Sequence, residues 1–134
     1  EKLEILIRTG QALGELHQAG MTHGRPALRD FLFNQGKVTL LDWENQPRSE
    51  NIKKRKTLDY LLLLLSLFRE PYARKDYVEA LEKGYADKAG GETREWARTF
   101  LRKHALIGHL AKALDVFHMK DVEAFSRLYR YLAD

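Results

Sequence analysis

Two carboxylates flank a short apolar segment, and a histidine and an arginine precede the first of them. Asp30 ends a stretch that begins Thr-His-Gly-Arg-Pro at Thr22, and Asp42 follows twelve residues later. Carboxylate oxygens are ligands that Mg²⁺ prefers, so we expect Asp30 and Asp42 to lie within reach of one shared divalent ion. Arg25 carries a planar guanidinium that is well suited to bidentate contact with phosphate. The two carboxylates thus suit a divalent cation, and the guanidinium suits an anionic group such as phosphate.

The elements that must position these residues are predicted to be a helix, a loop and a β-hairpin. Apolar residues recur at three- and four-residue spacing over 1–19, and Gly20 stands where a helix C-terminus favours a left-handed residue. Pro26 keeps the following loop out of helix. The short apolar runs 31–33 and 38–41 flank a turn that contains glycine, which predicts a hairpin. The two carboxylates would then stand at the entrance and the exit of this hairpin.

The remainder of the chain is predicted to be helical. The segment 56–68 has leucines on all sides and is expected to form a central, buried helix. Helical patterns follow over 76–85 and from 92 to about 117, with a loop at 89–91, and Asp121 is predicted to cap a last helix. The predicted fold class is therefore mainly α, a helical bundle with one short β-hairpin inserted between its first and second helices.

Length and composition predict one soluble globular domain that covers residues 1–134. The chain has 44% hydrophobic and 31% charged residues, a balance that excludes a disordered protein. It contains no cysteine, which excludes disulfides and thiolate metal sites and is compatible with a reducing compartment. The apolar run near 61–68 is too short for a membrane span, which needs about 20 residues. We expect a cytoplasmic protein, with peripheral contact at the inner membrane as a further expectation.

The charge of the chain favours an anionic partner. The formal net charge is +4, and Arg48 and residues 53–56 place five basic side chains within nine positions, shortly after Asp42. One interpretation of this basic cluster is a solvated loop and helix start, and the other is a binding surface for a phosphorylated substrate. The aromatic residues of the C-terminal half recur at helical spacing and are expected in the core, so nucleic acid is not an expected partner.

The order of these elements resembles the C-terminal lobe of the protein-kinase-like superfamily. The sequence motif His-Gly-Arg-Pro-Ala-Leu-Arg-Asp at 23–30 is most similar to that of atypical bacterial members, the lipopolysaccharide core and Kdo kinases. The resemblance covers roughly residues 3–68. It implies an ATP-dependent phosphotransferase that uses Mg²⁺ and acts on a lipopolysaccharide core sugar. The implied partners are a nucleotide and an anionic sugar or lipid-linked substrate.

The resemblance implies a role for each matching residue. His23 matches the loop histidine, which braces the loop against the element that carries Asp42. Asp30 falls where the family has a magnesium-binding asparagine, and Asp42 matches the metal aspartate of Asp-Phe-Gly, here Asp-Trp-Glu. Glu44 replaces the glycine of that element and is implied, with the two aspartates, in binding the cofactors ATP and Mg²⁺. Asp59 matches a buried aspartate that anchors the backbone of the catalytic loop.

Two departures from the family pattern keep an alternative open. Arg25 occupies the position of the catalytic base, and a guanidinium cannot accept a proton. Because phosphoryl transfer depends mainly on positioning and charge neutralisation, Arg25 would either stabilise the transferred phosphate or mark a pseudokinase that serves as a binding or scaffold module. The chain also lacks the Gly-rich loop and the strand lysine of the family's N-lobe, and residues before Glu1 would have to provide both. The sequence alone leaves the choice between enzyme and pseudokinase open.

Structural interpretations compete with these functional ones. Taken singly, His23 is a loop histidine and Asp42 a carboxylate at a strand end, whereas their combination at this spacing favours function. The C-terminal histidines do not predict a zinc site, because the gap between the first two places them on different faces of a helix. These histidines are His104, His109 and His118.

Overall fold

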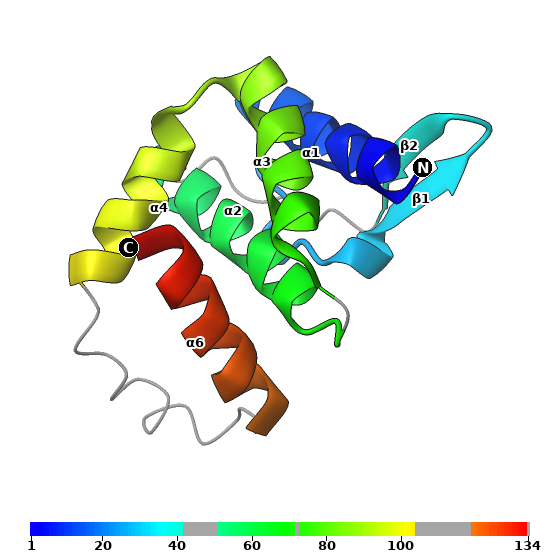
Figure 1. Cartoon of the computed structure of the whole chain (residues 1–134). Helices are drawn as coiled ribbons and strands as arrows, with labels where there is room; N and C mark the ends of the chain where they lie inside the picture. The colour runs from blue at the N-terminus through cyan, green and yellow to red at the C-terminus, as the bar shows by residue number, and fades with distance from the viewer. Residues whose placement is uncertain (42–50, 72, 104–118, 134) are drawn as a thin grey trace.

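Five α-helices, one 3₁₀ turn and one two-stranded antiparallel sheet make up the described part of the chain (Figure 1). The computed structural model describes residues 1–41, 51–71, 73–103 and 119–133. The fold is mainly α with one short β-hairpin between the first and second helices, as the sequence predicts. The elements in chain order are α1 (Lys2–Gln18), η1 (Leu28–Asp30), β1 (Phe31–Asn34), β2 (Lys37–Leu40), α2 (Ile52–Phe68), α3 (Lys75–Ala89), α4 (Glu92–Lys103) and α6 (Met119–Ala133).

Helix α1 ends at the glycine that the sequence indicates. Gly20 has a φ of 81°, a left-handed value that glycine adopts without steric cost. Its N–H donates to the carbonyl of His17 at 3.0 Å, and the N–H of Met21 donates to the carbonyl of Leu16 at 3.1 Å. These two bonds satisfy carbonyls that the helix end would otherwise leave open, in the manner of a Schellman motif. The chain therefore leaves α1 abruptly and enters the loop that carries His23.

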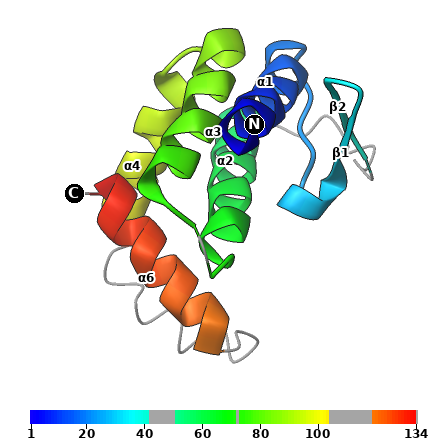
Figure 2. The same cartoon turned by 45° about the vertical axis from the view of Figure 1, so that its right-hand side comes forward.

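The predicted hairpin is confirmed, with a two-residue turn. Gln35 and Gly36 have φ values of 52° and 77°, as a type I′ turn requires. The turn fixes the register of the strands, and the guanidinium of Arg8 in α1 donates to the carbonyl of Gly36. The hairpin thus lies along the N-terminal part of α1, away from α4 and α6 (Figures 1 and 2). The paired residues are Phe31 with Leu40, Leu32 with Thr39, Phe33 with Val38, and Asn34 with Lys37.

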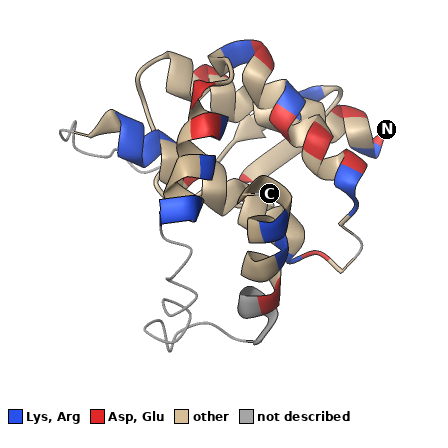
Figure 3. Cartoon of the chain, turned by 60° about the vertical axis from the view of Figure 1, so that its left-hand side comes forward, with Lys and Arg blue, Asp and Glu red and all other residues tan. Residues whose placement is uncertain are grey.

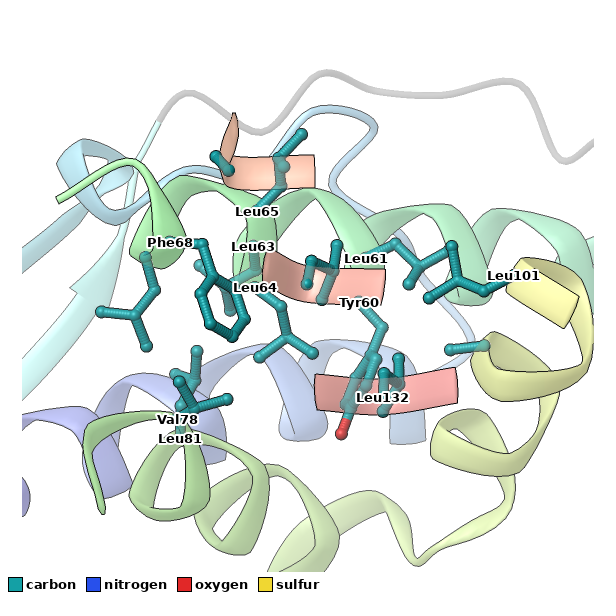
Figure 4. Close-up of a cluster of buried hydrophobic side chains, with 14 of the residues drawn as sticks. Tyr60, Leu61, Leu63, Leu64, Leu65, Phe68, Val78, Leu81, Leu101 and Leu132 are labelled. Carbon is teal, nitrogen blue, oxygen red and sulfur yellow. The ribbon is translucent and has the colours of Figure 1, made fainter. Parts of the chain in front are cut away.

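Helix α2 is the buried centre of the bundle, as the sequence predicts. It contacts α3, α4 and α6, and Figure 4 shows its side chains between residues of those three helices, including Val78, Leu101 and Leu132. Tyr60 and Leu64 are 3% and 1% exposed, so the helix has apolar partners on several sides at once. The buried leucines of α2 are Leu61, Leu63, Leu64, Leu65 and Leu67.

Helix α2 begins earlier than the apolar pattern indicates. The prediction places its start at Lys56, whereas the structure places it at Ile52, after the N-cap Asn51. The side-chain oxygen of Asn51 accepts the N–H of Lys54 at 3.3 Å, which satisfies a donor at the helix start. The basic cluster that follows Asn51 is therefore helical, and Figure 3 shows these basic residues gathered at the start of α2.

A buried carboxylate joins the central helix to the three helices around it. Glu82 of α3 accepts hydrogen bonds from the hydroxyls of Tyr60 in α2 and Tyr131 in α6, and from Nε of Arg94 in α4 at 2.7 Å. Burial, reinforced by the charge of Glu82, raises the pKa of Tyr60 well above its ordinary value. The same causes, burial first, raise the pKa of Tyr131. Both hydroxyls therefore keep their protons and act as donors to Glu82.

Helices α1 and α3 cross so closely that both need glycine at the contact (Figures 1 and 2). A Cβ atom added at Gly10 would lie 2.0 Å from the carbonyl oxygen of Leu81. One added at Gly84 would lie 1.8 Å from the carbonyl oxygen of Ile7. Both neighbours are backbone atoms, which cannot rotate away as a side chain does, so a larger residue would force the helices apart.

We expect Gly84→Ala to lower the free energy of unfolding by about 2 kcal/mol or more. Overpacking of a closed contact costs about 1–3 kcal/mol, and more when only backbone can move, while the better helix propensity of alanine offsets about 1 kcal/mol. Gly91→Ala is the matched control, because a Cβ there would meet no atom within 4 Å. Urea unfolding of both variants measures the difference. A Gly84→Ala protein as stable as the wild type would contradict the close crossing.

The predicted start of the last helix is also wrong. The sequence predicts Asp121 as the cap of the last helix, whereas α6 spans Met119–Ala133 and includes this residue. Aspartate is favourable both at the N-cap and inside the first turn, where it complements the helix dipole, so the two positions have similar sequence signals. The second half of the helix predicted from 92 to about 117 lies outside the described residues, as do His104, His109 and His118. None of the helices in the described ranges has the length and apolar character needed to cross a bilayer.

Candidate functional site

The loop between α1 and the hairpin is fixed by one carboxylate of α2. Asp59 is 1% exposed, and its Oδ2 accepts the backbone N–H of His23 at 2.7 Å. Its Oδ1 accepts the backbone N–H of Gly24 at 2.8 Å. A buried carboxylate is costly unless it is hydrogen-bonded, and these donors compensate the loss of water. The prediction of a buried Asp59 that holds the backbone of this loop is confirmed.

A second histidine shares this carboxylate, and the sequence predictions did not include it. The side chain of His17 is fully buried, with Nε2 2.9 Å from Oδ2 of Asp59 and Nδ1 2.5 Å from the hydroxyl of Tyr85. The Tyr85 hydroxyl lies 2.9 Å from Oγ1 of Thr93. The network therefore ties the loop to α1, α2, α3 and the start of α4. The position of His17 one turn after Leu13, on the buried stripe of α1, is the sequence signal that would have identified it.

His23 joins the loop to the end of the hairpin. Its Nδ1 accepts the backbone N–H of Arg25 at 3.2 Å, and its Nε2 lies 3.0 Å from the carbonyl oxygen of Leu41. Because Nδ1 accepts, the proton of a neutral ring is on Nε2, which donates to Leu41. Leu41 directly precedes Asp42, so the geometry agrees with the bracing role that the resemblance implies for His23.

Asp30 stands at the entrance of the hairpin and is almost buried. Its Oδ2 accepts the N–H of Ala27 at 2.9 Å and lies 3.9 Å from Nε2 of His23. Its backbone carbonyl accepts the N–H of Leu41 at 2.6 Å, which brings the entrance and the exit of the hairpin together. A carboxylate has about four lone-pair sites, so these contacts leave Asp30 able to bind a cation. Its oxygen donors fit a hard divalent ion such as Mg²⁺.

Arg25 is exposed and lines a cavity of about 610 Å³ together with His23 and Asp30. A guanidinium that stabilises a transferred phosphate must face this cleft, on the side of Asp30 and Asp42. Arg25 does line the cleft, although the structure records no ion pair between Arg25 and Asp30, both of which lie in the described part of the chain. An exposed guanidinium at the edge of a cavity is accessible to a phosphate group.

Two of the predicted site residues, Asp42 and Glu44, lie outside the described residues. The shared ion between Asp30 and Asp42 therefore stays a prediction. Within the ranges that the structure describes, no three side chains of the metal-binding types gather at one point. The part of the site that the structure describes is the loop with His23, Arg25 and Asp30, and the anchor that Asp59 gives it.

Burial of Tyr85 makes the anchoring network sensitive to alkaline pH. Burial raises the pKa of Tyr85 to about 12; the charge of Asp59 adds to this effect, and the hydrogen bond with Thr93 opposes it. The rings of His17 and Tyr60 pack edge-on against Tyr85 at 5.4 and 5.0 Å between centroids. The neutral phenol is therefore part of the folded structure, and its ionisation opposes folding.

We expect stability to fall as the pH rises from about 10 to about 12. An unfolded tyrosine has a pKa of about 10, so the folded chain holds this proton more tightly. The contribution, about 2–3 kcal/mol, is complete below pH 10 and is lost as the pH rises through the folded value. Tyr85→Phe removes the ionisable group and should lose less stability over this interval, as urea unfolding at each pH will show. A variant that loses stability as steeply as the wild type would contradict this assignment.

The chain is similar to an uncharacterized protein of Haemophilus influenzae. The two are 28% identical over 131 residues, which cover 96% of this chain and 53% of the relative. The chain thus spans about half the length of the curated relative it matches. No model of a protein family and no solved structure matches the chain.

Proposed function

We propose that the chain is part of an ATP-dependent phosphotransferase of the protein-kinase-like superfamily, with residues 22–30 as its catalytic loop. The observation that supports this most is the anchor of that loop. Asp59 of the buried helix accepts the N–H groups of His23 and Gly24, and the ring of His23 binds the carbonyl of Leu41. One carboxylate and one imidazole thereby set the distance between the loop and the strand end, as positioning of a phosphate group requires.

In this proposal each polar residue of the loop has a separate role. Asp30 holds the metal of the nucleotide, with Asp42 and Glu44 as the sequence-predicted further ligands. Mg²⁺ neutralises the charge that develops between the β- and γ-phosphates when it is bound. Arg25 contacts the transferred phosphate, because its exposed guanidinium borders the same cavity as Asp30. No base is assigned, since positioning and charge neutralisation account for most of the catalysis of phosphoryl transfer.

The proposed acceptor is a lipopolysaccharide core sugar, as part of an anionic or lipid-linked substrate. The sequence of residues 23–30 supports this acceptor through its resemblance to the lipopolysaccharide kinases, and the net charge of +4 is compatible with an anionic substrate. The corresponding location is the cytoplasm, with peripheral contact at the inner membrane. The basic first turn of α2 could provide such contact with anionic headgroups.

One observation favours a second candidate, a pseudokinase that serves as a binding or scaffold module. Arg25 stands at the base position, and its guanidinium forms no ion pair with a residue of the described ranges. A guanidinium supplies charge but no proton acceptor. The loop would then keep its kinase-like shape, held by Asp59, without transferring phosphate.

Phosphate transfer from labelled ATP tests the proposal. The full protein that carries this chain is incubated with purified lipopolysaccharide core, and label in the core is counted. The enzyme proposal predicts incorporation that depends on added Mg²⁺. Absence of incorporation with an intact, ATP-binding protein would exclude this acceptor and favour the pseudokinase.

A further inference from the structure

Four arginine side chains line the cavity beside the proposed catalytic loop. The cavity has a volume of about 610 Å³ and lies between the loop and one face of α2. Arg25 and Arg29 come from the loop, Arg55 comes from α2, and Arg69 follows α2 as its C-cap residue. Four guanidinium groups around one concave surface favour an anionic ligand, because guanidinium binds phosphate and carboxylate in bidentate pairs.

Two carboxylates line this cavity within the described ranges, and both accept hydrogen bonds from the loop backbone. Both oxygens of Asp59 accept hydrogen bonds from the loop backbone, and His17 adds a third contact. Asp30 accepts the N–H of Ala27. Arg29 is exposed, and no residue of the described ranges forms an ion pair with it. Four arginines and two aspartates are among the described residues that line the cavity, so this lining carries more positive than negative charge.

The loop runs along α2, so the arginines of the loop lie at two different ends of the cavity. The start of the loop is bound to Asp59, whereas Leu28 near its end donates its N–H to Oγ of Ser66 at 3.1 Å. Asp59 and Ser66 are separated by about 10 Å along the helix axis, from a rise of 1.5 Å per residue. Arg29 directly follows Leu28, and Arg69 lies one turn after Ser66 on the same face.

The helix face between the two ends is largely apolar. Leu58, Leu62 and Leu65 line the cavity between Arg55 and Arg69. A ligand that spans this floor would present an uncharged body to the leucines and anionic groups to the arginines. One end, with Arg25, is the end that the proposed function assigns to the transferred phosphate. The other end, with Arg29 and Arg69, has no role in that chemistry.

We propose that Arg29 and Arg69 form a docking site for a phosphate ester that the acceptor already carries. The inference rests on the proposed function for the identity of the ligand as the acceptor, but binding itself requires no transfer. A phosphate seated at this end would hold the acceptor along α2 toward the Asp59 end of the cavity, where the loop carries Arg25; the two ends are about 10 Å apart along the helix axis. The site thereby selects phosphorylated over unphosphorylated acceptors.

Calorimetric titration of the chain with glucose 6-phosphate, with glucose as the uncharged probe, tests the docking site. We expect the sugar phosphate to bind and glucose not to bind. Arg29→Gln and Arg69→Gln should each weaken binding about tenfold or more, since a charge-assisted hydrogen bond is lost. Arg130→Gln is the matched control, because Arg130 is exposed on α6 and does not line the cavity. Arg29→Lys should bind with intermediate affinity, because it keeps the charge and loses the planar fork.

A parallel arm identifies the source of the phosphate. Vesicles that contain phosphatidic acid are compared with phosphatidylcholine vesicles in sedimentation with the same variants. Binding of the phosphatidic acid vesicles alone, lost in Arg29→Gln, supports the docking site and assigns its phosphate to a lipid headgroup. Failure of both phosphate probes to bind, or an equal loss of binding in Arg130→Gln, would overturn the docking site.

Transfer kinetics separate this inference from the proposed function. In the full protein, Arg29→Gln should raise KM for a phosphorylated acceptor and leave kcat close to its original value. It should not change KM for the same acceptor after phosphatase treatment. Transfer with an unchanged KM would refute the docking site and leave the enzyme proposal standing. Binding of glucose 6-phosphate that depends on Arg29, without any transfer, would support the docking site and count against the enzyme.

Discussion

Asp59→Ala is expected to lower the free energy of unfolding by about 3–5 kcal/mol, because several hydrogen-bond donors lose a shared buried acceptor. The substitution leaves the ring of His17 and the backbone N–H groups of His23 and Gly24 without their acceptor. The bonds from His17 and His23 are buried and the bond from Gly24 is partly buried. Water therefore replaces the carboxylate poorly, and an orphaned buried donor costs about 1–3 kcal/mol. Because domains have total stabilities of about 5–15 kcal/mol, this one change removes a large share.

The loss of stability in Asp59→Ala originates at the loop, so both the whole chain and the loop amides should be measured. Urea unfolding gives the total loss, and Asp87→Ala, on the exposed side of α3, is a control of the same type expected to change stability by less than about 0.5 kcal/mol. Hydrogen exchange of the His23 and Gly24 amides adds a site-specific reading, since both should lose protection in Asp59→Ala before the helices open. Retained protection of these two amides, or a loss of stability below about 1 kcal/mol, would contradict the anchoring role.

The elements that the sequence predicted correctly depend on local signals. Gly20 ends α1 and Gly36 closes the hairpin because each position needs a positive φ, a requirement visible in a few residues of sequence. The start of α2 was placed too late for a local reason as well. Residues 53–56 are basic and have no apolar periodicity, so the sequence around Asn51 does not distinguish a helix start from a loop.

The contacts that hold the site together are not local. His17 reaches an aspartate 42 residues away and a tyrosine 68 residues away, and no spacing pattern indicates such pairs. Asp59 was predicted to hold the loop through the resemblance alone, since a carboxylate in an apolar helix does not identify its partners. The close approach at Gly10 and Gly84 was missed for the same reason, because each glycine is interpretable only when the partner helix is known.

The cavity shows how an error at a helix boundary hides a surface. With α2 starting at Lys56, Arg55 belongs to a basic loop and bears no relation to Arg69. With the observed start at Ile52, Arg55 lies on α2, and cavity-lining leucines of the helix connect it to Arg69 at the C-cap. The sequence placed Arg25 and Asp30 on one loop correctly, but it could not place that loop along this face, because tertiary packing decides where the loop lies.

Arg25→Ala is expected to slow phosphate transfer about 10³- to 10⁵-fold in the full protein, if the enzyme proposal holds. Guanidinium groups that stabilise a transferring phosphoryl group contribute on that scale. The side chain is exposed, so its removal should leave the free energy of unfolding within about 0.5 kcal/mol of the wild type. Arg130→Ala on α6 is the control, with a rate equal to that of the wild type. A rate loss in Arg25→Ala that comes with a lower stability would point to a structural role instead.

Asp42→Ala completes the comparison, since it tests the metal carboxylate that the sequence assigns. In an enzyme, Asp42→Ala and Arg25→Ala should both abolish most transfer, and added Mg²⁺ should not restore either variant, because the ligand or the phosphate contact is missing. In a pseudokinase, no transfer is detectable for the wild type or the variants, and partner binding stays largely intact in Arg25→Ala. Transfer that survives Asp42→Ala unchanged would show that the chemistry takes place elsewhere in the protein. Labelled ATP, measured for wild type and both variants under one condition, distinguishes these three outcomes.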